Sequence, residues 1–181
     1  DGAERMLRKF RTFRRDHSGL AAVEFAFILP VMLVLVFGAI EITDAVICKS
    51  DVSDAASAYA DLIAQESSVG TADMTNVFSA INAMIYPFPT SNLKVVITSV
   101  IDDGHGGAKV DWSKANTGRA RTAGATIVVP AGLVTAGGSV ILAEVTYNFT
   151  PPTTWLVKIP ISMSNNFYSH PRRVPQVKWT S

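Results

Sequence analysis

Charge and cysteine are both scarce in this 181-residue chain. Charged residues make up 17% of the sequence, against about a quarter in an average soluble domain. Because the mean hydropathy is also positive, we expect part of the chain to lie in a non-aqueous solvent. Cys48 is the only cysteine, which excludes a disulfide within one chain and any zinc or iron–sulfur site built from cysteines. We expect a buried apolar role for Cys48, with a disulfide between subunits as the alternative.

Motifs of catalysis and nucleotide binding are missing as well. The sequence has no GxSxG, HExxH, P-loop or Rossmann fingerprint, and its three histidines are scattered. The segment DDGHGG at 102–107 offers Asp102, Asp103 and His105 as metal ligands. Its Asp-Gly and Gly-Gly pairs favour a hairpin turn instead, and it lacks the EF-hand spacing. We therefore expect no enzyme activity, no metal and no cofactor, and a membrane-tethered hydrolase is the weakest hypothesis.

One apolar run is long enough to cross a membrane. Residues 20–40 read LAAVEFAFILPVMLVLVFGAI and contain a single charged residue, Glu24. At about 1.5 Å per residue, this run matches a hydrocarbon core of about 30 Å. A cleaved secretory signal would have a shorter apolar region and a small-x-small site, whereas this run leads into further helical sequence. The sequence therefore predicts a retained transmembrane helix at 20–41.

Charges flank this run asymmetrically, with basic residues before it and acidic residues after it. The positive-inside rule then makes residues 1–19 a basic cytoplasmic leader and residues 42–181 an extracytoplasmic domain. Apart from Phe10 and Phe13, the basic cluster lacks the aromatic residues that usually interleave with charge in a nucleic-acid site. We expect the inner membrane as a partner and no nucleic acid.

Glu24 lies inside the apolar run, where a charged side chain costs about 2.5–3.5 kcal/mol near a helix centre. No Lys or Arg lies within the run. In one interpretation, Glu24 reaches the membrane interface and contacts lipid headgroups or Arg15. In the other, a cut after Gly19 creates an α-amino group on Leu20, about one turn from Glu24 in the same helix or a neighbouring one. The residues alone leave both interpretations open.

The arrangement RRDHSG followed by LAAVEF resembles the class III signal of type IV prepilins: a basic leader, a glycine, an apolar helix, and a glutamate five residues after that glycine. The wider run over residues 10–41 is similar to the opening of the TadE-like family, which comprises pseudopilins and minor pilins of the tight-adherence (Tad/Flp) type IV pilus system. This resemblance implies a bacterial inner-membrane protein that is cut between Gly19 and Leu20 by a prepilin peptidase. It also implies an assembly role for Glu24, with other pilins, pseudopilins and pilus-assembly proteins as partners.

Phe25 departs from the pattern, because processed Flp-type pilins often carry a tyrosine directly after the glutamate. The alternative function is therefore an uncleaved, membrane-anchored binding or accessory module outside the cytoplasm.

The remainder of the sequence predicts an α+β domain. Apolar positions three and four apart continue the first helix over about 42–66, and a second helix is predicted over 71–86 with Thr71 as its N-cap. Strands are predicted at 93–101, 108–114, 125–130 and 139–149, followed by an extended piece at 155–164. Because short glycine-containing turns link these strands, we expect an antiparallel sheet packed on the helices, in a pilin-like plan.

Overall fold

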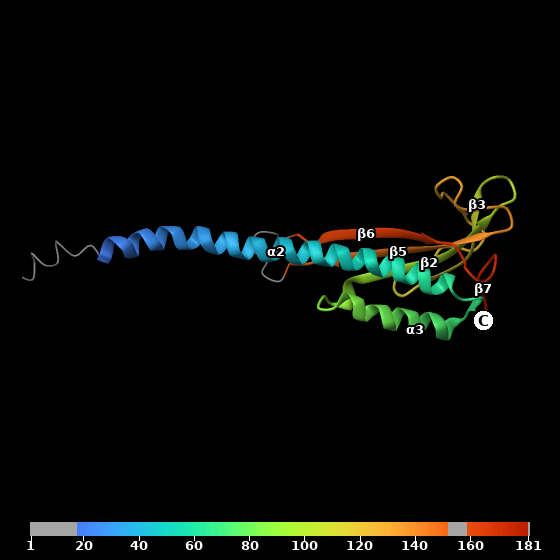
Figure 1. The fold of residues 1–181 in the computed structure, drawn as a ribbon, viewed down its shortest axis with the longest axis horizontal. Helices are drawn as coiled ribbons and strands as arrows, with labels where there is room; N and C mark the ends of the chain where they lie inside the picture. The colour runs from blue at the N-terminus through green and yellow to red at the C-terminus, as the bar shows by residue number, and fades with distance from the viewer. Residues whose placement is uncertain (1–17, 152–158, 181) are drawn as a thin grey trace, which may run out of the picture.

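The computed structural model describes residues 18–151 and 159–180 as an α+β protein with one long helix and a compact head (Figure 1). Helix α2 runs without interruption over Ser18–Ala64, 47 residues, which corresponds to about 70 Å. Its first half projects from the head, and its second half lies along the sheet (Figure 1). The predicted fold class, including a long first helix that continues from the apolar run into the head, is confirmed.

Two environments divide α2. Leu20 to Val36 are exposed throughout, as expected for a segment whose solvent is not water. From Cys48 onward, one face is fully buried at spacings of three and four residues, the period of a helix packed on one side. That face consists of Cys48, Val52, Ala55, Ala56, Tyr59, Ala60, Ile63 and Ala64. Ile42, Val46 and Leu62, which share the predicted periodicity, are exposed instead.

The sheet has five strands in the order β4-β3-β2-β5-β6, and every pairing is antiparallel. Its long strands are β2 (Leu93–Asp102), β3 (Ala108–Ala115), β5 (Ser139–Phe149) and β6 (Ile161–Ser169). The edge strand β4 comprises only Thr126–Ile127, shorter than the predicted 125–130. Pro130 cannot donate to a ladder, and Val128 is 93% exposed, so the chain leaves the sheet there.

Strand β6 lies further along the chain than predicted. It pairs with β5 from Ile161 opposite Phe149 to Ser169 opposite Ile141, whereas the prediction placed an extended piece at 155–164. Residues 155–158 lie outside the described part of the chain. The long partner β5 fixes this register, since the sequence ISMSNNFYS carries no regular alternation of apolar residues that would mark it as a strand.

The second helix, α3, spans Thr71–Asn82 and is followed by the 3-10 turns η1 (Ala83–Ile85) and η2 (Thr90–Asn92). The N-cap is Gly70, not the predicted Thr71, because the Gly70 carbonyl accepts the Met74 N–H at 3.1 Å. The Asp73 carboxylate accepts the Gly70 N–H at 2.8 Å, which is half of a capping box. Phe78 then packs edge-on against Tyr59 of α2, with ring centroids 5.8 Å apart.

A short parallel pair closes the head where α2 ends. Strand β1 (Ser68–Val69) pairs with β7 (Lys178–Trp179) near the end of the chain. Trp112 of β3 donates its indole N–H to the Val177 carbonyl at 2.8 Å, which ties this pair to the sheet. The sequence gives no local signal for a pairing across so many residues.

The packing of α2 on the sheet yields a stability prediction. Ala60 is fully buried in the helix–sheet contact, so Ala60→Leu should force the two layers apart and lower the free energy of unfolding by about 1–3 kcal/mol. The matched control is Ala80→Leu on the exposed side of α3, which should change it by less than about 0.5 kcal/mol. Urea unfolding of the detergent-solubilised chain measures both; equal effects would contradict the close-packed contact.

Candidate functional site

The residues singled out in the sequence lie together at the start of α2. Gly19, Leu20 and Glu24 fall within the first turns of this helix, and all three are exposed. Leu20 and Glu24 are four positions apart, so they share one face. Helical side chains lean toward the N-terminus, which directs the Glu24 carboxylate back toward the backbone of Leu20.

Gly19 has no packing partner that would require a glycine. A Cβ built at this position meets no atom within 4 Å, and glycine in a helix is about 1 kcal/mol less favourable than alanine. The fold of the described chain therefore gives no reason for glycine here. A requirement for a small residue at position 19 would come from another protein that acts on the peptide bond between Gly19 and Leu20.

Glu24 and Glu41 are two acidic residues of α2 in opposite environments. Glu24 is exposed, and no ion pair within the described residues engages it. Glu41 is only 2% exposed and has an interaction partner inside the molecule. The sequence assigned Glu41 to the acidic flank after the membrane, but the structure buries its side chain. Of these two glutamates, Glu24 is thus the one that stays accessible to a partner.

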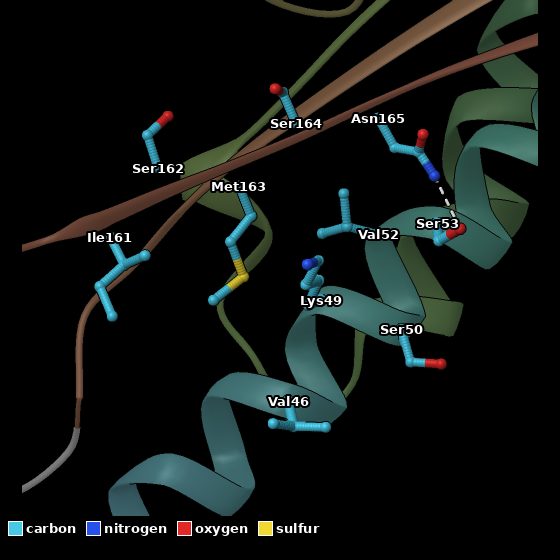
Figure 2. A pocket seen from close by; sticks show the side chains of 10 residues that line it. All are labelled: Val46, Lys49, Ser50, Val52, Ser53, Ile161, Ser162, Met163, Ser164 and Asn165. Atoms are coloured by element: carbon cyan, nitrogen blue, oxygen red, sulfur yellow. Dashed lines mark hydrogen bonds between the residues drawn. The ribbon is translucent and has the colours of Figure 1, made fainter.

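Sequence reasoning missed a groove between α2 and the edge strand β6, shown in Figure 2. The groove has a volume of about 720 Å³ and is lined by Val46, Lys49, Ser50, Val52 and Ser53 of α2 and by 161–165 of β6. The Asn165 amide donates to the Ser53 hydroxyl at 2.6 Å and bridges the two elements (Figure 2). Among these lining residues Lys49 alone is titratable, so they supply no acid–base pair for hydrolysis.

A second hollow of about 610 Å³ continues beside the same two elements, from Ser57 and Asp61 of α2 to Phe167 and the segment after β6. The ion pair between Asp61 and Arg172 lies at this end. The Arg172 N–H also donates to the Ala64 carbonyl at 2.9 Å, so the segment after β6 is fastened to the last turn of α2. The small Ser57 side chain of α2 lines this space, but the sequence of α2 alone could not have predicted which strand lies opposite.

The segment DDGHGG forms the hairpin turn between β2 and β3, as predicted. One Asp103 oxygen accepts the N–H groups of His105 and Gly107, at 2.7 and 2.9 Å. These hydrogen bonds to the charged form lower the pKa of Asp103 below its ordinary value. Gly104 and Gly106 adopt φ values of +83° and +85°, which glycine tolerates best. The residues considered as metal ligands therefore shape the turn.

Cys48 is fully buried against the sheet, which confirms the expectation of an apolar core role. A disulfide between subunits would need an accessible sulfur, and this position does not offer one.

The open surroundings of Gly19 lead to a prediction about stability. Gly19→Ala should keep the helix content and should not lower the free energy of unfolding, because the added methyl group enters open space and alanine favours a helix by up to about 1 kcal/mol over glycine. Circular dichroism and urea unfolding in detergent provide the test. A large loss of stability would mean that Gly19 has a structural role in this chain.

Comparison with known proteins gives one match. The family model described as TadE-like protein matches residues 19–61. No curated protein matches the chain, and no solved structure matches it. The matched segment covers nearly all of α2 and ends before the sheet. It includes Gly19, Leu20 and Glu24, as well as the α2 side of the groove. From Gly19 to Asp61, this chain therefore matches the TadE-like family, as its sequence predicted.

Proposed function

We propose that this protein is a minor pilin or pseudopilin that acts in the assembly of a Tad/Flp-type pilus. The carrying observation is that the TadE-like match falls on a continuous helix whose apolar first part is exposed ahead of a packed head. The family is of the pilin type and is connected with Tad pilus systems. A structural subunit fits this shape better than an enzyme does.

The helix fits a single-pass membrane anchor. Over the described residues, Gly19–Ala64 is the one helix long and apolar enough to span a bilayer, and its most apolar window is unburied. In the proposed orientation, the basic leader 1–19 is cytoplasmic, residues 20–41 cross the bacterial inner membrane, and the domain 42–181 lies outside the cytoplasm. The charge asymmetry around the apolar run supports this orientation.

The proposed roles of the site residues follow from their positions. Gly19 admits the prepilin peptidase at the bond to Leu20, since no side chain at this position shields the backbone. After the cut, Leu20 carries a new α-amino group at the start of the helix. Glu24, one turn along the same face, pairs with this cation or with that of a neighbouring subunit, which offsets the cost of a carboxylate in the apolar segment.

Processing is tested by intact mass and N-terminal sequencing of the protein extracted from membranes. We expect an N-terminus at Leu20 in cells that contain the prepilin peptidase, and an intact leader in cells that lack it and in Gly19→Ala. An intact leader in every strain would refute processing and favour the alternative of an uncleaved, membrane-anchored binding or accessory module.

Glu24 is tested by Glu24→Gln, which keeps the shape of the side chain and removes its charge. We expect normal processing but a drop of roughly tenfold or more in assembled pili, because an α-amino group in the apolar region loses its counter-charge. Glu66→Gln, an exposed glutamate beyond the end of α2, is the matched control and should assemble normally. Pilus counts by electron microscopy measure the outcome, and full assembly by Glu24→Gln would exclude a role for the charge.

A further inference from the structure

The fully exposed part of α2 is slightly shorter than the hydrocarbon core of a bilayer is thick. The helix is exposed over residues 19–36, a length of about 27 Å. A hydrocarbon core measures about 30 Å, and a helix tilted by the usual ~20° needs more length than an upright one. To span the core, α2 must therefore use residues beyond Val36.

The helix becomes buried at that level. Gly38 is buried, and Glu41 is only 2% exposed. Within the described helix, no stretch beyond Val36 is exposed on all sides, so none is left to serve as a spacer between the bilayer and the head. Because α2 is continuous through this point, the head also cannot swing away on a flexible linker.

The end of the head that faces the anchor carries exposed isoleucines. Ile42 of α2 is 63% exposed, and Ile159, just before β6, is 75% exposed. Strand β6 begins at this end of the head (Figure 1). Ile161, also partly exposed, lies across the groove from the exposed Val46 of α2 (Figure 2). Apolar side chains from two separate elements therefore gather at the level where the bilayer surface must lie.

We propose that the base of the head is seated on the outer surface of the bilayer, with Ile42 and Ile159 inserted at the boundary between headgroups and acyl chains. Transfer of apolar side chains out of water is favourable. Amphipathic surfaces typically enter this boundary by about 5–10 Å. The partner of this surface is lipid, and the two isoleucines fix the depth of the head. The burial of Glu41 keeps a carboxylate at this depth away from lipid.

The proposal rests on the anchor and not on cleavage after Gly19, so its test is independent of processing. The opposite end of the molecule supplies a matched control, since Val128 is an apolar residue that is 93% exposed on the loop after β4. Ile42→Cys, Ile159→Cys and Val128→Cys each introduce one accessible thiol into the full chain. The native Cys48 is fully buried, and the unaltered protein measures its background labelling.

Each variant is labelled with an environment-sensitive fluorophore and reconstituted into vesicles of phosphatidylethanolamine and phosphatidylglycerol, with or without nitroxide-labelled lipid. We expect a blue-shifted emission and severalfold stronger quenching by the nitroxide lipid at positions 42 and 159 than at position 128. The far-ultraviolet circular dichroism spectrum of each variant confirms folding; all three side chains are exposed, so the core is undisturbed.

Two outcomes would overturn the proposal. Equal, weak quenching at all three positions would place the whole head in water. Quenching at position 42 without quenching at position 159 would show that the helix enters the interface while the sheet stays above it. Either result would leave the processing and pilus-assembly tests unaffected.

Discussion

The contact between the alanine face of α2 and the sheet determines the rest of the structure. Ala55, Ala56, Ala60 and Ala64 are fully buried, and their short side chains let the helix backbone lie close to β5 and β6. This contact fixes the direction of α2 relative to the strands, and therefore the direction in which the apolar first half projects. It also sets the level at which the head begins to cover the helix.

Because only its second half packs on the sheet, the two halves of α2 present different sets of residues. The exposed half carries Gly19, Leu20 and Glu24, which no described part of the head covers. The buried half holds the sheet and leaves the groove beside β6, where Ser50 and Ser53 are too small to fill the space. The proposed roles of Gly19, Leu20 and Glu24 at one end of α2 thus require no change in the core at the other end.

Features with a local cause could be predicted from the sequence. The helix period around Tyr59, the long β2 and β5 strands and the turn built on Asp103 all follow from nearby residues. The bounds of strand β6, predicted only as an extended piece at 155–164, and the β1–β7 pair could not be predicted, because their pairing partners are distant and their own residues lack a regular apolar pattern. The groove was missed for the same reason. The N-cap of α3 lies at Gly70, one residue before the predicted Thr71, because the Asp73 carboxylate accepts the Gly70 N–H.

The continuity of α2 through the junction with the head has a mechanical consequence. A helix with no break between Ser18 and Ala64, clamped to a sheet over its second half, behaves as a stiff rod joined to a solid block. A force applied to the apolar end along its axis is transmitted to the head with little loss, and the two move together by the same distance. A force that drew α2 out of a bilayer along its axis would therefore move the whole molecule as one rigid body, with no need to unfold the head.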